Sequence, residues 1–152
     1  MTILSVSDEA KPPAGFVPME PYGPFHELVG PLYVAEQDGR TVVGLRVAEK
    51  HRNKGAMIHG GMFLMLLDTA MTHACARVRR ADRVGVTTSL SSELFAPAAP
   101  GDWVQAEVEV MRAGGRVVFL NCVVRRDGPD GELLARGSST FQLVARESRA
   151  GP

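Results

Sequence analysis

The sequence has no net charge, because Lys+Arg and Asp+Glu both number 17. It therefore lacks the strong basic field that attracts nucleic acid or an anionic membrane, and we expect neither as a partner. A small net charge also gives little repulsion between copies of the chain, so self-association is tolerated.

Long apolar runs and cysteines are scarce as well. No apolar run approaches the roughly 20 residues that cross a bilayer. The N-terminal MTILSVSDEAKPP has neither the basic nor the apolar region of a signal peptide, so we expect a cytoplasmic protein. Cys75 and Cys122 stand in apolar contexts without the spacing of a metal site, which predicts reduced core residues. Hydrophobic residues make up 45% and charged residues 22%, as in a globular domain.

The chain reads as one domain. Residues 1–24 contain several prolines among small and polar residues, which predicts a poorly ordered lead-in. A single domain is expected over residues 25–148. A short helix around Phe25–Val29 is an option. Asp38-Gly39 between two β-prone runs is a strong hairpin signal. The polar segment 49–58 predicts a loop.

A helix is predicted from Gly60 to about Arg77, since the segment has no proline and is rich in Met, Leu and Ala. One apolar stripe follows helical spacing, and further apolar residues lie off it, which is typical of a helix wrapped by other elements. The stripe consists of Leu64, Leu67, Met71, Ala74 and Val78.

Four long β-prone segments, separated by Pro- and Gly-rich turns, follow this helix. The order of two strands, one long helix and a run of strands predicts an α+β fold, with an antiparallel meander around one helix.

Asp68 stands at the border of the apolar stripe, beside Leu64 and Met71. Burying a carboxylate there costs solvation energy unless partners compensate for it. Two interpretations follow. Asp68 is either a structural aspartate, paired with an arginine elsewhere or exposed at a helix edge, or a catalytic base or nucleophile in a semi-apolar cleft.

His59-Gly60-Gly61 stands where the helix should begin. Helix N-termini present unpaired N–H groups and a partial positive charge, and glycines let a ligand approach them, which suits a developing oxyanion. Gly60 and Asp68 are eight residues apart, or about 12 Å along a helix axis. If both act in one reaction, they must come from two copies of the chain.

Several motifs together resemble the hotdog-fold acyl-CoA thioesterases, most closely the phenylacetate-pathway (PaaI-like) branch. These are HGGMFLMLLDTA at 59–70, Asn53 six residues before His59, and GVTTSLSSELFAPAAPGD after the helix, within a likeness over roughly residues 40–145. The resemblance implies a hotdog fold, with one long central helix wrapped by a curved antiparallel sheet. It also implies a homodimer with a continuous sheet, usually paired again into a homotetramer, and an acyl-CoA substrate.

The resemblance also implies roles for individual residues. The Gly60 amide stabilises the oxyanion, while Asp68 of the partner chain acts as general base or nucleophile. Asn53 holds the carbonyl or the water, and His59 orders the loop and can contact the acyl carbonyl. The water is positioned by a hydroxyl, for which Thr87 matches the usual serine and Thr88 is the adjacent alternative.

Further candidates for substrate binding are Gly61 and an adaptable apolar pocket that includes Met65. The phosphates of coenzyme A could meet Arg116 or the helix-end arginines Arg77, Arg79 and Arg80. Gly114-Gly115-Arg116 is more simply a hairpin turn. The acyl group, aryl or medium-chain aliphatic, is left open.

Other functions remain as alternatives. A non-catalytic acyl-CoA-binding regulator has no use for a desolvated carboxylate, and a hotdog dehydratase would use His59 with a carboxylate at the β-carbon of a hydroxyacyl thioester. His51 and His59 have no third metal ligand in the sequence, so we expect no metal, and no motif indicates a cofactor. We expect His73 to be solvated or at an interface.

Overall fold

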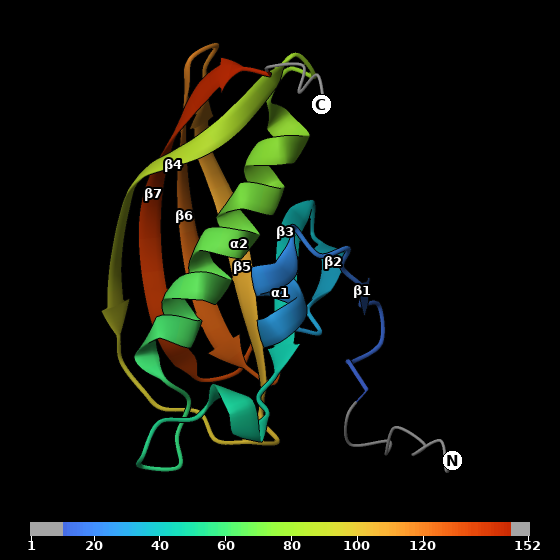
Figure 1. The fold of residues 1–152 in the computed structure, drawn as a ribbon, viewed down its shortest axis with the longest axis vertical. Helices are drawn as coiled ribbons and strands as arrows, with labels where there is room; N and C mark the ends of the chain where they lie inside the picture. The colour runs from blue at the N-terminus through green and yellow to red at the C-terminus, as the bar shows by residue number, and fades with distance from the viewer. Residues whose placement is uncertain (1–10, 147–152) are drawn as a thin grey trace.

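The computed structural model describes residues 11–146, in which a seven-stranded antiparallel sheet curves around one long helix (Figure 1). The strand order is β1-β2-β3-β5-β6-β7-β4. The predicted α+β architecture, with a central helix wrapped by an antiparallel sheet, is confirmed. The strands are β1 (Val17–Pro18), β2 (Tyr33–Gln37), β3 (Arg40–Arg46), β4 (Arg83–Leu94), β5 (Trp103–Ala113), β6 (Val117–Arg126) and β7 (Leu133–Ala145).

The predicted hairpin connects β2 to β3. Gln37 pairs with Arg40, so the loop consists of Asp38 and Gly39 alone. Both have positive φ, 50° and 75°, as a type I′ turn requires. The twist of this turn matches that of the flanking strands, which is why Asp-Gly is such a reliable signal.

The central helix α2 (Gly60–Val78) follows the predicted bounds closely. The predicted stripe is only partly buried: Leu67, Met71 and Ala74 are buried, but Leu64 is 38% and Val78 is 44% exposed. The sheet also covers apolar residues that lie off the stripe. Because the helix is apolar on most sides, its periodicity alone could not show which face the sheet would cover. The buried residues of α2 are Phe63, Leu66, Leu67, Thr69, Ala70, Met71, Ala74 and Cys75.

Part of the N-terminal segment packs against the sheet. Phe16 and Met19 are buried, and the Phe16 ring meets Trp103 edge-on at 4.9 Å between centroids. β1 pairs with β2. The predicted poorly ordered lead-in, 1–24, thus contains packed residues in its described part, and residues 1–10 lie outside the described residues.

Two short helices flank the site described below. The optional helix of the sequence is present as α1 (Pro24–Val29), and the predicted loop 49–58 contains a 3₁₀ helix, η2 (Glu49–His51). His51 is buried and joins the two, because its Nδ1 accepts from the Ala48 amide at 2.9 Å and its Nε2 then donates to the Val29 carbonyl at 2.6 Å. Both ring nitrogens of His51 are used in this contact.

β4 forms one edge of the sheet and pairs only with β7 among the described strands. Its pairing shifts between Thr87 and Ser89, which marks a β-bulge at Thr88. Val84 and Val86 are 36% and 46% exposed along this edge. The strand therefore presents unpaired backbone groups and apolar side chains together.

Candidate active site

The α2 N-terminus leaves one amide without an acceptor. His59 is the N-cap residue, and its Nδ1 accepts from the Gly61 amide at 2.9 Å. A Cβ on Gly61 would lie 3.0 Å from this nitrogen, so glycine lets the imidazole approach the backbone. Within residues 11–146, the Gly60 N–H has no hydrogen-bond acceptor. The amide predicted to hold an oxyanion is thus free to do so.

The cap also determines the tautomer of His59. Since Nδ1 accepts a hydrogen bond, the proton of the neutral imidazole is on Nε2. The exposed edge of His59 therefore presents a donor, which suits a carbonyl oxygen better than it suits proton abstraction at a β-carbon. This arrangement favours contact with a thioester carbonyl over the proton abstraction that the dehydratase alternative requires.

Asn53 lies in the loop before α2. Its Oδ1 accepts from the Gly55 amide at 2.7 Å and from the Met57 amide at 3.4 Å, so the carbonyl of the side chain folds its own loop. The Nδ2 group remains as a donor. Asn53 and His59 line the same open hollow of about 830 Å³, so the structure brings these two predicted residues together.

Apolar residues surround Gly60 on its other side. A hollow of about 310 Å³ is lined by Gly60, Phe63, Leu94, Phe95 and neighbouring residues. A Cβ on Gly60 would lie 3.2 Å from Leu94 Cδ1, which shows how closely β4 approaches the start of the helix. A ligand at the Gly60 amide would thus have an apolar wall beside it.

Asp68 lies two turns further along α2 and is half-buried. The Thr87 hydroxyl donates to its Oδ1 at 2.8 Å. Thr88, the bulge residue, donates instead to the Thr140 carbonyl at 3.0 Å. Of the two hydroxyls left open by the sequence, only Thr87 contacts Asp68, and no arginine pairs with the carboxylate in the described part of the chain.

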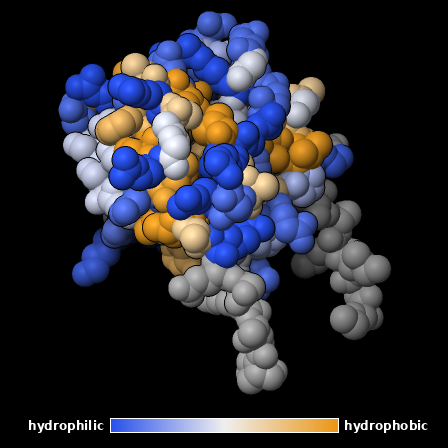
Figure 2. Space-filling model, turned by 90° about the horizontal axis from the view of Figure 1, so that it is seen from above, coloured by the Kyte–Doolittle hydropathy of each residue, from blue (hydrophilic) through white to orange (hydrophobic). Residues whose placement is uncertain are grey.

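The remaining predicted residues lie apart from this pair. Met65 is partly buried, and its sulfur accepts a hydrogen bond from the Thr69 hydroxyl at 3.3 Å. Arg116 is exposed in the turn between β5 and β6, at the end of the molecule where α2 ends (Figure 1). Figure 2 looks down on this end, where patches of hydrophobic side chains lie among hydrophilic ones. Within one chain, Arg116 is thus at the opposite end from Gly60.

The helix-end arginines have partners of their own. Arg77 pairs with Glu36, Arg79 donates to the Arg83 carbonyl and Arg80 pairs with Asp82 at 3.1 Å. Arg116 has no such partner among the described residues. Of the candidates for phosphate contact, Arg116 is therefore the one whose guanidinium is not already engaged.

Sequence reasoning missed a group of aromatic and histidine side chains on the other side of Asp68. His26 of α1 contacts Thr69, the residue after Asp68, at 3.2 Å. Tyr22 contacts His73 at 2.6 Å, so His73 is half-buried rather than solvated. No spacing rule could have found these contacts, because they join residues 43 and 51 positions apart.

Burial affects the titration of these groups. It lowers the pKa of His26, an effect that the nearby Asp68 carboxylate partly opposes. Burial, followed by the charge of Arg77, lowers the pKa of His73. Among residues 11–146, no three His, Cys, Asp or Glu side chains are grouped to hold a metal ion. No helix in this range is long and apolar enough to cross a membrane.

Comparison with known proteins places this arrangement in a family. The model of the thioesterase superfamily matches residues 55–132, just over half of the chain. The chain therefore belongs to the thioesterase superfamily, and it is a thioester hydrolase of the hotdog fold. The matched range includes the Gly60 amide, Asp68 and Thr87.

Individual relatives agree with this assignment. The chain is similar to a putative esterase, PA0474, of Pseudomonas aeruginosa, with 33% identity over 86% of this chain and 96% of that protein. It is 26% identical to human acyl-coenzyme A thioesterase 13, over 78% of this chain and 84% of that one. A mutant structure of the phenylacetic acid degradation protein PaaI from Thermus thermophilus superposes with a TM-score of 0.68 at 26% identity, covering 79% of this chain and 98% of that chain.

Proposed function

We propose that the protein hydrolyses an acyl-CoA thioester to a carboxylic acid and coenzyme A. The observation that carries this proposal is the Gly60 amide at the N-terminus of α2, which has no acceptor among the described residues and follows directly on the capping His59. Donors fixed in place before the reaction stabilise the charge that develops on a thioester oxygen. Acyl-CoA as the substrate is supported by the name of the human relative and by the apolar hollow at Gly60.

Asp68 supplies the general base or the nucleophile of the reaction. Thr87 holds Oδ1, which leaves Oδ2 without a hydrogen-bond partner among the described residues. As a general base, Asp68 takes a proton from water while the oxygen of that water bonds to the thioester carbon. The tetrahedral intermediate then collapses, the C–S bond breaks, and the sulfur of coenzyme A takes the proton back. As a nucleophile, Asp68 bonds to the thioester carbon, and the C–S bond breaks to release the thiolate of coenzyme A. Water then opens the mixed anhydride, which frees the carboxylic acid and the Asp68 carboxylate, and the proton from water goes to the thiolate.

The Gly60 amide and the Asp68 carboxylate of one site come from two copies of the chain. Gly60 and Asp68 lie on one continuous helix, about 12 Å apart, and cannot both reach one carbon atom. The surface that contains Asp68 also exposes Leu64, and the neighbouring β4 edge is unpaired. Pairing β4 with the β4 of a second copy would extend the sheet and cover these groups. We infer a homodimer on this basis, and a homotetramer remains a prediction from the family resemblance.

The test is hydrolysis of a panel of medium-chain and arylacetyl-CoA thioesters, measured by the release of free thiol. Wild type should turn over at least one member, and Asp68→Asn should lose roughly 100-fold or more in kcat. An Asp68→Asn variant as active as wild type would reject the mechanism. Tight binding without thiol release would indicate a regulator, and hydration of an enoyl thioester without thiol release would indicate a dehydratase.

A further inference from the structure

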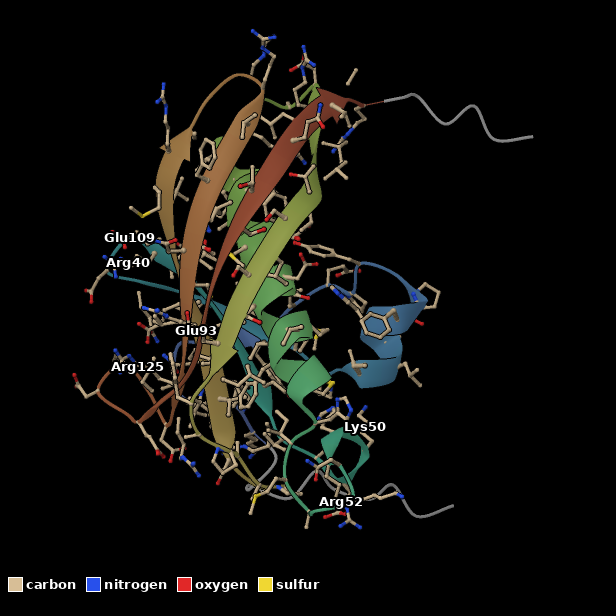
Figure 3. All side chains as sticks on the ribbon, turned by 90° about the vertical axis from the view of Figure 1, so that its left-hand side faces the viewer. Arg40, Lys50, Arg52, Glu93, Glu109 and Arg125 are labelled. Atoms are coloured by element: carbon tan, nitrogen blue, oxygen red, sulfur yellow. The ribbon has the colours of Figure 1, made fainter. Side chains whose placement is uncertain are left out.

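The short helix α1 lies on the side of α2 that faces away from the sheet (Figure 3). Phe25 and Leu28 contribute little to this packing, because they are 58% and 71% exposed. Little apolar area is thus removed from water by these two residues. The side chain that α1 directs at α2 is polar: His26 is half-buried and contacts Thr69.

The hydrogen bonds of His26 determine its protonation. The Tyr22 amide donates to Nδ1 at 3.2 Å, so this nitrogen carries no proton. In the neutral imidazole the proton is then on Nε2, which donates to the Thr69 hydroxyl at 3.2 Å. The Thr69 hydroxyl in turn donates to the sulfur of Met65 at 3.3 Å. These three hydrogen bonds form one series from Tyr22 to Met65, in which every donor has an acceptor.

This series of hydrogen bonds ends on the helical turn that contains Asp68. Thr69 is only 2% exposed and follows Asp68 directly in α2. Asp68 is therefore flanked on one side by Thr87 of β4, which bonds its carboxylate, and on the other by α1, which bonds the next residue. The carboxylate also raises the pKa of His26 against the larger lowering by burial, so the two groups interact through space as well.

We propose that His26 is a positioning residue for Asp68. Through Thr69 it fixes the α2 turn and keeps α1 against it, so that the carboxylate is oriented when the thioester arrives. This inference rests on the proposed function. Since small displacements of a catalytic group cost rate rather than ground-state affinity, loss of the His26 contact should lower kcat more than it changes KM.

Two substitutions separate the two bonds of His26. His26→Gln can still donate to Thr69 from its amide nitrogen, whereas His26→Asn is too short to do so but can still accept from the Tyr22 amide. Thr69→Val removes the hydroxyl at nearly the same volume. Glu27→Gln is the control, because Glu27 is exposed on the same helix.

We expect His26→Asn and Thr69→Val each to lower kcat about tenfold, with KM within about twofold. The double variant should be no worse than either single one, because both remove the same contact. His26→Gln should stay within about threefold of wild type, and Glu27→Gln should match wild type. Each assay is run well below the thermal unfolding midpoint of the variant, so that loss of folded protein does not lower kcat.

The inference is overturned if His26→Asn turns over like wild type, if the Gln and Asn variants lose kcat equally, or if the effects of His26→Asn and Thr69→Val add. Asp68→Asn is assayed in parallel. If Asp68→Asn is inactive and His26→Asn is fully active, only the inferred role of His26 is refuted. If Asp68→Asn is active, the proposed mechanism itself is refuted.

Discussion

The Thr87 hydroxyl lies 2.8 Å from Asp68 Oδ1 and donates to it, which joins the edge strand β4 to the central helix. The bond restricts rotation of the carboxylate about its side-chain torsions. It also distinguishes the two oxygens, since Oδ1 accepts from Thr87 and Oδ2 has no hydrogen-bond partner among the described residues. The arginine pairing that the simpler interpretation from sequence included is absent among residues 11–146.

Replacing Thr87 tests the value of that bond. Thr87→Val keeps the shape but removes the donor, and we expect kcat to fall about tenfold or more because Asp68 loses its orientation. Thr87→Ser keeps the hydroxyl and should stay within about threefold. Equal losses in the two variants would show that the methyl group, not the hydroxyl, matters.

Gly60→Pro removes the proposed oxyanion donor and adds a Cβ 3.2 Å from Leu94 Cδ1. Proline is well tolerated at the first position of a helix, and His59 has φ −66° and ψ 134°, which suits a residue before proline. We expect kcat to fall about 100-fold or more. Gly60→Ala keeps the N–H and is the matched control, with a milder loss caused by its contact with Leu94. If Gly60→Pro were as active as Gly60→Ala, the amide would not be the donor.

Mixing two inactive variants tests whether the site spans two chains. In a heterodimer of Asp68→Asn and Gly60→Pro, one of the two sites would combine an intact Gly60 with an intact Asp68. Co-expression with two different affinity tags, followed by tandem purification, should therefore restore up to about half of the wild-type rate, as expected when two complementary groups meet across an interface. A heterodimer as inactive as its parents would place both groups in one chain.

Three histidines should make stability depend on pH. Burial lowers the pKa of His26, His51 and His73 in the folded protein, so below the unfolded value of about 6.5 the unfolded chain binds more protons. Stability should thus be full above about pH 6.5 and fall as the pH drops from there. Urea unfolding midpoints between pH 7.5 and 5.5 measure this, and His73→Gln should flatten the dependence. A midpoint that rose on acidification would contradict these shifts.

Gly44 in β3 should be intolerant of any side chain. A Cβ there would lie 2.0 Å from Cζ2 of Trp103, whose ring is 1% exposed and cannot move outward freely. Gly44→Ala should destabilise the protein by about 3 kcal/mol through overpacking. Gly115→Ala is the control, because a Cβ there meets nothing within 4 Å. Denaturant unfolding of both variants would show the difference, and equal midpoints would refute it.

Local signals predicted the elements of this fold well. The Asp38-Gly39 turn depends on two adjacent residues, and the limits of α2 depend on a cap and on helix-forming residues within it. The buried positions of Cys75 and Cys122 also followed from their apolar neighbours. Each of these features is encoded within a few residues of where it appears.

Other features depend on contacts that sequence spacing does not contain. The face of α2 that the sheet covers could not be predicted, because the helix is apolar on most sides, and Leu64 and Val78 of the stripe are exposed. The choice between Thr87 and Thr88 is made by a bulge in pairing with β7, a strand about 50 residues later. The approach of His26 to Thr69 likewise requires the chain to fold back over 43 residues.

The bulge at Thr88 changes which residues of β4 face inward. Before it the odd-numbered Gly85 and Thr87 face α2, and after it the even-numbered Leu90 and Leu94 do so. An edge strand that bends in this way is a poor template for an arbitrary straight strand, since backbone pairing would fall out of step at residue 88. A second strand with the same irregularity can match it. The feature that aims a hydroxyl at Asp68 thus also protects a long open edge from adventitious aggregation.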